Sequence, residues 1–251
     1  MPNLAFPNDA TPIGSIAYYA IRFSAPDKQN ALAARYNWLN EIDRIVTTIK
    51  DPGVARLKLD WWKKEWAQAL DGKATHPISL ACNNALPDNA LNIIENIFIS
   101  SEKAILGFSQ FNEQDWLAEI KQRACLKFSF LTGKPLTKES SNAAMCSELY
   151  TLLFSLPQQL SIGRQPLPQA HLEDAQKALT SVEHFNVLLN APIWQALTKQ
   201  PKDQHDEKLI DRFLLQQKAD MKRLRKVGFT ADRYVAFPIV RLIRAWQARD
   251  V

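Results

Sequence analysis

The sequence predicts an all-α protein of eight to ten helices, formed by one domain over residues 1–251. Apolar residues recur at a spacing of three to four in most windows, whereas alternation with a period of two is scarce. Proline and glycine fall mainly between these windows. Hydrophobic residues make up 46% of the chain, enough for a sizeable core. No internal repeat and no long linker divides it.

The helices of the first half follow from apolar spacing and from local start and stop signals. Asp27 and Lys28 open the second helix after Pro26. Asp51-Pro52 opens the third, because proline is tolerated in a first turn, and Asp71-Gly72 ends it. The expected helices of this half are 13–23, 28–49, 53–70, 90–107 and 114–131.

The second half continues the same pattern with two interruptions. The segment 157–170, LPQQLSIGRQPLPQ, is the clearest irregular stretch, and 199–205 is a second one that we expect to be exposed. The expected helices of this half are 139–156, 171–189, 206–226 and 231–248.

Composition and charge exclude several classes of protein. No apolar run approaches the roughly 20 residues that span a bilayer, and the N-terminus does not read as a secretory signal. We expect a cytoplasmic location, with peripheral contact at the inner membrane as an alternative. The net charge is +5, and the basic residues of 218–226 are interpreted as a solvated helix face first and a surface for anionic membranes second. No nucleic-acid motif accompanies them, so no nucleic-acid partner is expected.

Most catalytic and metal-binding templates are absent. The three cysteines form no C-x-x-C pair, which argues against a disulfide framework or a zinc site. The four histidines lack H-E-x-x-H spacing, and neither G-x-S-x-G nor a glycine-rich phosphate loop occurs. No residue is therefore assigned a catalytic or metal-binding role.

One face of the helix expected at 28–49 is polar. Tyr36, Asn40, Asp43 and Thr47 follow one another at spacings of four, three and four, so they project from one side. A polar helix face turned to water is the alternative interpretation. On the next helix, Trp62 and Trp66 lie one turn apart and are expected to pack in the core.

Two segments carry a resemblance to a known family. The stretch 51–82, DPGVARLKLDWWKKEWAQALDGKATHPISLAC, and the stretch 15–32, SIAYYAIRFSAPDKQNAL, resemble the N-terminal part of the squalene/phytoene synthase family. The resemblance implies an isoprenoid-synthase-like helical bundle around a central cleft. It also implies head-to-head joining of two prenyl diphosphates, with magnesium as cofactor.

The chain departs from that family where magnesium would bind. The first D-x-x-x-D motif of the family falls on Asp43–Thr47, where the second carboxylate is missing. The second acidic motif should fall near 150–170, yet residues 149–162, LYTLLFSLPQQLSI, contain no Asp or Glu. Small residues of the family near 125–129 are replaced by larger ones such as Leu126, Lys127 and Phe128, which would crowd a pocket.

Two hypotheses follow from this conflict. The first is a non-catalytic member, similar to the phytoene-synthase-like domain of mitochondrial complex I assembly factors, which binds an isoprenoid-like lipid or a protein partner. It needs no cofactor. The second is an active magnesium-dependent prenyltransferase that uses carboxylates from elsewhere, for example Glu41, Glu148 or Asp43. Under both, the expected binding residues for an isoprenoid or prenyl diphosphate are Tyr19, Arg22, Tyr36, Asn40 and Asp43.

Overall fold

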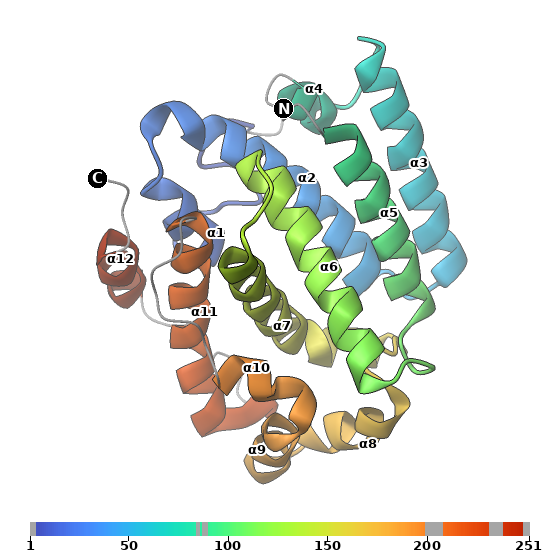
Figure 1. Cartoon of the computed structure of the whole chain (residues 1–251), viewed down its shortest axis with the longest axis vertical. Helices are drawn as coiled ribbons and strands as arrows, with labels where there is room; N and C mark the ends of the chain where they lie inside the picture. Colours follow the sequence, from blue (N-terminus) through green and yellow to red (C-terminus); the bar gives the residue numbers. More distant parts are fainter. Residues whose placement is uncertain (1–3, 84–85, 87–89, 199–207, 231–237, 248–251) are drawn as a thin grey trace.

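The computed structural model confirms the all-α prediction. It describes residues 4–83, 86, 90–198, 208–230 and 238–247, which contain twelve α-helices and no strand. Figure 1 shows the helices gathered around α6 and α7, with α3 and α12 on opposite flanks. The α-helices are α1 (Ile16–Arg22), α2 (Pro26–Thr48), α3 (Pro52–Leu70), α4 (Pro77–Asn83), α5 (Ala90–Leu106), α6 (Glu113–Thr132), α7 (Lys138–Ser161), α8 (Gln169–Ala178), α9 (Val182–Asn190), α10 (Gln195–Thr198), α11 (Lys208–Val227) and α12 (Pro238–Gln247).

Side-chain caps set several helix starts. The Ser15 hydroxyl accepts a hydrogen bond from the Tyr18 N–H at the start of α1, which begins later than the expected residue 13. The Asp51 carboxylate does the same for Val54 at the start of α3, as the Asp-Pro signal predicted. At the far end of α6, Gly133 adopts a φ of 81°, a left-handed conformation that glycine tolerates. The Ser15 and Asp51 side chains satisfy backbone N–H groups that have no partner inside their helices.

Two expectations about helix boundaries were wrong. Helix α7 does not stop at 156 but continues through Pro157 to Ser161, because buried Leu153 and Leu156 keep this segment packed despite the missing N–H. The segment 171–189 forms two helices rather than one, since Ser181 caps a new helix by accepting from the His184 N–H. The short helices α4 and α10 were not predicted. Residues 199–205 and 231–237 lie outside the described part of the chain.

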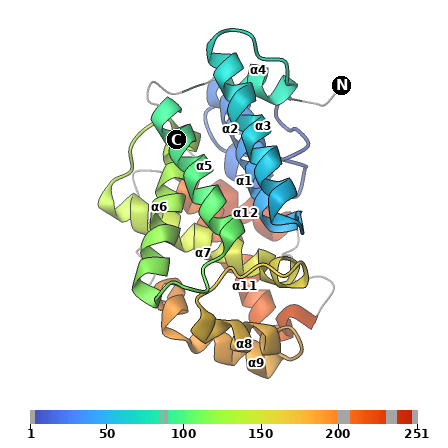
Figure 2. The ribbon, with the colours of Figure 1, turned by 90° about the vertical axis from the view of Figure 1, so that its right-hand side faces the viewer.

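The interior between α2, α3 and α5 is a dense aromatic cluster. The Trp38 ring, fully buried, contacts Trp66, Phe98 and Phe130 at centroid distances of 5.3, 5.8 and 4.9 Å. Trp62 and Trp66 are both buried, as the sequence predicted, whereas Trp61 is 46% exposed. Figure 2 shows α3 beside α2 on the outer side of the bundle. Edge-to-face contacts of this kind add to the gain from burial.

The last turns of α3 and the chain that follows it are joined by Glu65. Its carboxylate accepts from the backbone N–H groups of Thr75 and His76 at 2.9 and 2.7 Å, and from the Thr75 hydroxyl at 3.0 Å. Burial by itself raises the pKa of Glu65, but the hydrogen bonds from His76 and Thr75 lower it below its ordinary value. The buried Glu65 side chain is thus a structural acid that fixes the turn into α4.

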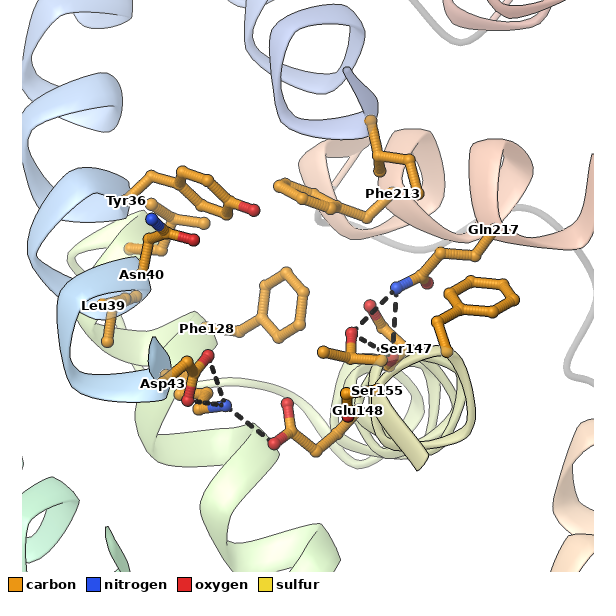
Figure 3. A pocket seen from close by; sticks show the side chains of 15 residues that line it. Tyr36, Leu39, Asn40, Asp43, Phe128, Ser147, Glu148, Ser155, Phe213 and Gln217 are labelled. Atoms are coloured by element: carbon orange, nitrogen blue, oxygen red, sulfur yellow. Dashed lines mark hydrogen bonds and ion pairs between the residues drawn. The ribbon is translucent and has the colours of Figure 1, made fainter. Parts of the chain in front are cut away.

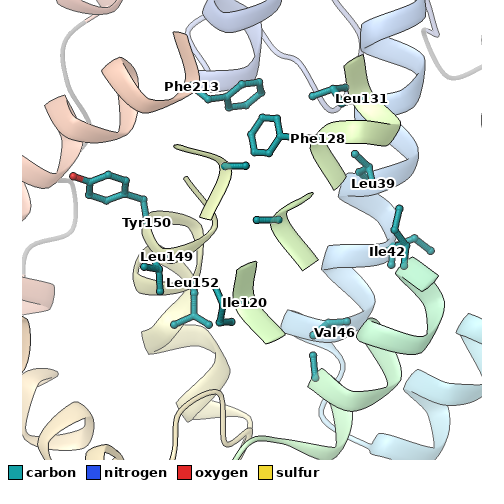
Figure 4. Close-up of a cluster of buried hydrophobic side chains, with 14 of the residues drawn as sticks. Leu39, Ile42, Val46, Ile120, Phe128, Leu131, Leu149, Tyr150, Leu152 and Phe213 are labelled. Carbon is teal, nitrogen blue, oxygen red and sulfur yellow. The ribbon is translucent and has the colours of Figure 1, made fainter. Parts of the chain in front are cut away.

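Two further sets of contacts hold α11 against α1 and against the helices at the centre of the bundle. The Arg212 guanidinium on α11 donates to the Ala20 carbonyl and to the Ser24 hydroxyl, both at 2.6 Å, and so attaches α11 to the end of α1. Apolar side chains of α2, α6, α7 and α11 meet in the buried cluster of Figure 4, which includes Ile42, Ile120 and Leu149.

Candidate functional site

A cavity of about 340 Å³ lies between α2, α6, α7 and α11. Figure 3 shows side chains from these helices converging on it. Its lining combines aromatic and aliphatic side chains with uncharged polar groups and three charged residues. The lining residues are Ile16, Tyr36, Leu39, Asn40, Asp43, Lys127, Phe128, Leu131, Ser147, Glu148, Thr151, Phe154, Ser155, Phe213 and Gln217.

Helix α2 supplies the polar stripe of the cavity. Tyr36, Asn40 and Asp43 project into it from successive turns, as their spacing predicted (Figure 3). Thr47 is the next residue of this stripe in the sequence, but it does not line the cavity. Its hydroxyl donates to the Asp43 carbonyl at 2.8 Å. One carboxylate of α2 therefore faces the cavity.

Four charged side chains meet at one end of the cavity, and we call them the charge cluster: Asp43, Arg123, Lys127 and Glu148. The Lys127 ammonium lies 2.8 Å from Asp43 Oδ1, 2.9 Å from Asp43 Oδ2 and 2.7 Å from Glu148 Oε1. The Arg123 guanidinium reaches the same two acids, with Nη2 2.9 Å from Asp43 and Nε 3.1 Å from Glu148. Two cations of α6 thus neutralise one acid of α2 and one of α7.

Burial and pairing act in opposite directions on the ionisation of this cluster. Burial alone raises the pKa of Asp43, but Lys127 and Arg123 lower it below its ordinary value. Burial likewise lowers the pKa of Arg123, whereas Glu148 and Asp43 raise it above its usual range. Both groups are held in their charged forms, and the side chains of Arg123, Lys127 and Glu148 are each only 10% exposed.

Among the polar atoms of the cavity, the buried Oε1 of Gln217 on α11 has no hydrogen-bond partner. On α2, the Tyr36 hydroxyl and the Asn40 carboxamide also make no hydrogen bond within the described structure; they lie one turn apart, with Asp43 one turn beyond Asn40 (Figure 3). Burial and the nearby carboxylates of Asp43 and Glu148 raise the pKa of Tyr36, so its hydroxyl stays protonated. The pair offers a donor from Tyr36 and both a donor and an acceptor from Asn40.

The α7 wall of the cavity carries hydroxyl groups beside the single acid Glu148. Thr151 and Ser155 line the cavity from α7, four residues apart, which is the spacing of a D-x-x-x-D motif. Their hydroxyls donate to the carbonyls of Ser147 and Leu152 of the same helix. Gln217 of α11 donates to the Ser147 carbonyl at 3.1 Å and to Thr151, which fixes its carboxamide.

The structure separates the five expected binding residues into two groups. Tyr36, Asn40 and Asp43 line the cavity, whereas Tyr19 and Arg22 are not among its lining residues. Tyr19 is buried with its ring edge against Tyr18 at 5.1 Å, and Arg22 is exposed on the last turn of α1. Contact of any of them with a ligand stays a prediction.

Sequence reasoning missed the cations of the charge cluster. Lys127 was expected to crowd the pocket by its size, as was Phe128, and both do line the cavity, whereas Leu126 does not. The charge of Lys127 and its pairing were not anticipated, nor was Arg123 noticed. Their spacing of four was the available signal, because it places both cations on one face of the helix.

The residues of the cavity do not fit a magnesium–diphosphate centre. Such a centre needs carboxylate oxygens that are open to the metal, yet Asp43 and Glu148 are both occupied by Lys127 and Arg123. Among the residues that the structure describes, no group of three or more His, Cys, Asp and Glu side chains is arranged to hold a metal ion.

Fold and site together define a helical-bundle protein whose central cleft carries an internally neutralised set of charges. Residues 14–111 match the model of the squalene/phytoene synthase family, and this match supports membership of the chain in that family with an isoprenoid-synthase-like fold. The match covers less than half of the chain and includes α1 to α5. Comparison with curated proteins gave no match. Within the described ranges, no helix is both long and apolar enough to cross a bilayer.

Proposed function

We propose that this protein is a non-catalytic member of its family that binds a single elongated apolar ligand, isoprenoid-like in shape, in the cavity between α2, α6, α7 and α11. The observation that carries the proposal is the position of Lys127. Its ammonium lies within 2.9 Å of oxygens of both Asp43 and Glu148, the two acids of the lining whose oxygens would have to be open to hold a metal ion.

A buried ammonium in this position opposes metal-dependent chemistry in two ways. It occupies the carboxylate oxygens that Mg²⁺ would need, and it repels a divalent cation in an environment where charges are weakly screened. Without the metal, the departing diphosphate of a prenyl substrate loses the charge neutralisation on which the reaction depends. Thr151 and Ser155 do not replace it, since neutral hydroxyls are weak ligands for a hard divalent ion.

The lining supports binding rather than catalysis. Apolar side chains such as Leu131, Phe154 and Phe213 line the cavity together with polar groups from α2, α7 and α11. This combination is typical of small-molecule sites, in which apolar contacts hold the ligand and a few polar groups orient it. The volume of about 340 Å³ lies near the lower end of the roughly 300–1,000 Å³ of such pockets, which favours one bound chain over two.

The second candidate function is an active head-to-head prenyltransferase. One observation favours it: Asp43 and Glu148 face the same cavity from opposite helices. For activity, both cations of α6 would have to leave these acids when magnesium and substrate arrive. A protein-partner role, with the cavity unused, is the outcome that remains if no lipid binds.

The test is a pair of measurements on the purified chain. With magnesium and farnesyl or geranylgeranyl diphosphate, we expect no release of pyrophosphate above background. With the same prenyl chains in alcohol form, we expect a saturable change in tryptophan fluorescence or melting temperature. Pyrophosphate release that disappears in Asp43→Ala would establish the prenyltransferase instead, and absence of any ligand response would leave the protein-partner role.

A further inference from the structure

We infer that the polar end of the ligand is an uncharged hydroxyl, held by Tyr36 and Asn40, so that the cavity selects long-chain alcohols over the diphosphates that the family resemblance implies. The inference rests on the proposed function, because it names the class of ligand for the same cavity. Its basis is the distribution of charge and of unpaired hydrogen-bonding groups along α2.

The cation that lines the cavity is already paired with carboxylates, so it is not open to an anionic head group. Only Asp43, Lys127 and Glu148 among the lining residues are charged, and Arg123 behind them completes a cluster of two acids and two cations. The Lys127 ammonium contacts oxygens of both acids. A diphosphate placed here would meet two carboxylates and would have to break an ion pair to gain a cation, while losing its own hydration.

A ligand hydroxyl matches the two unpaired groups of α2, the Tyr36 hydroxyl and the Asn40 carboxamide. The Tyr36 O–H can donate to the hydroxyl oxygen, and the Asn40 carboxamide can accept the hydroxyl proton. Both groups lie one turn apart on the cavity face of α2. The Tyr36 ring is held by Phe213 of α11 at a centroid distance of 5.7 Å, so its hydroxyl is positioned before a ligand arrives. Prepositioned donors and acceptors of this kind give specificity because a ligand lacking the group leaves them unsatisfied.

Apolar side chains from three helices supply the surface for the chain of such a ligand. Phe128 and Leu131 of α6, Phe154 of α7 and Phe213 of α11 line the cavity. An alcohol with its hydroxyl at Tyr36 and Asn40 would lay its chain along these side chains. Arg22, which the sequence suggested as a partner for an anionic head group, takes no part because it does not line the cavity.

Three ligands with one chain and different ends test this directly: farnesol, farnesyl methyl ether and farnesyl diphosphate. They are titrated into the full chain without magnesium, with tryptophan fluorescence and thermal shift as the readouts. We expect farnesol to bind at least tenfold more tightly than the diphosphate. The ether, which cannot donate, should bind several-fold more weakly than farnesol.

Tyr36→Phe is the matched variant, because it removes one hydroxyl and keeps the ring that contacts Phe213. It should weaken farnesol binding by about 2- to 10-fold while leaving the diphosphate unchanged. Arg22→Ala serves as the control and should change neither affinity. Circular dichroism and the melting curve of each variant establish that it is folded.

The outcomes separate the inference from the proposed function. Tighter binding of the diphosphate without turnover, or equal binding of farnesol by Tyr36→Phe and by the wild type, would overturn the hydroxyl assignment while a non-catalytic lipid-binding role stands. Absence of binding by all three ligands would overturn both. Metal-dependent turnover of the diphosphate would likewise overturn both and restore the prenyltransferase.

Discussion

Helix α2 faces two different interiors. Toward α3 and α5 it presents Trp38, which is fully buried among three other aromatic rings. Toward α7 and α11 it presents Tyr36, Asn40 and Asp43 to a cavity of about 340 Å³. Protein interiors are normally packed to the density of organic crystals. The contrast shows that the chain can fill the space beside α2 on one side, and that the space on the other side is retained with its own polar lining.

The largest expected effect is on the packed side. Trp38→Ala should lower the free energy of unfolding by about 3–5 kcal/mol, because it leaves a void between Trp66, Phe98 and Phe130 that rigid rings cannot fill. Urea unfolding followed by circular dichroism measures the loss. A loss below about 1 kcal/mol would mean that the two sides of α2 do not differ in packing as described.

The cavity side should respond through charge rather than volume. Lys127→Met removes the ammonium that contacts both Asp43 and Glu148, and should cost about 3 kcal/mol, because one acid of the cluster is left without compensation. Lys127→Met combined with Glu148→Gln should recover part of that loss, since the second change removes the uncompensated acid. Strictly additive losses in the double variant would show that Lys127 and Glu148 are not coupled.

A smaller effect is expected at Glu65, whose partners are mainly backbone N–H groups. Glu65→Gln should cost about 1–2 kcal/mol at neutral pH, because the hydrogen bonds to Thr75 and His76 lose their charged acceptor. The pKa of Glu65 is lowered in the folded protein, so its contribution is present above the ordinary carboxyl pKa and is lost as pH falls through the folded value. The gap between wild type and variant should therefore shrink below about pH 4. A gap that is constant from pH 7 to pH 3 would contradict this assignment.

The smallest effect is expected on the outer face of α3. Trp61 is 46% exposed and its ring contacts Trp62 and His76 from outside the core, so Trp61→Ala should lower the free energy of unfolding by only about 1 kcal/mol. Its neighbour Trp62, only 5% exposed, provides the matched comparison for the same substitution. Similar losses at both positions in urea unfolding would show that the two tryptophans are not divided between core and surface.

The sequence predicted the parts of this structure that depend on local periodicity. Tyr36, Asn40 and Asp43 were placed on one face by their spacing, and the start of α3 by Asp51 and Pro52. Helix spacing alone says which residues of one helix share a side; it does not say which other helix lies opposite. The pairing of Asp43 with Arg123 and Lys127, some 80 residues further along, is a tertiary contact of that kind.

Errors arose where a local signal was outweighed by packing. Pro157 predicted the end of a helix, but the buried leucines before it hold α7 in place through Ser161. The break between α8 and α9 was missed because a Thr-Ser pair is a weak stop signal beside strong apolar spacing. Arg22, expected from the resemblance and from guanidinium chemistry to meet an anionic head group, is exposed on the last turn of α1 and does not line the cavity; its contact with a ligand stays a prediction.

The attachment of α11 to α1 by Arg212 has a consequence for how the protein is made. The hydrogen bonds from Arg212 to Ala20 and Ser24 join positions that are almost the whole chain apart, and Phe213 and Gln217 on the same helix form one wall of the cavity. During synthesis, the helices that carry Asp43, Lys127 and Glu148 emerge well before that wall exists. A ribosome-bound chain that ends before residue 208 is therefore expected to expose this apolar lining to water, and the cavity is complete only once α11 has packed against α1.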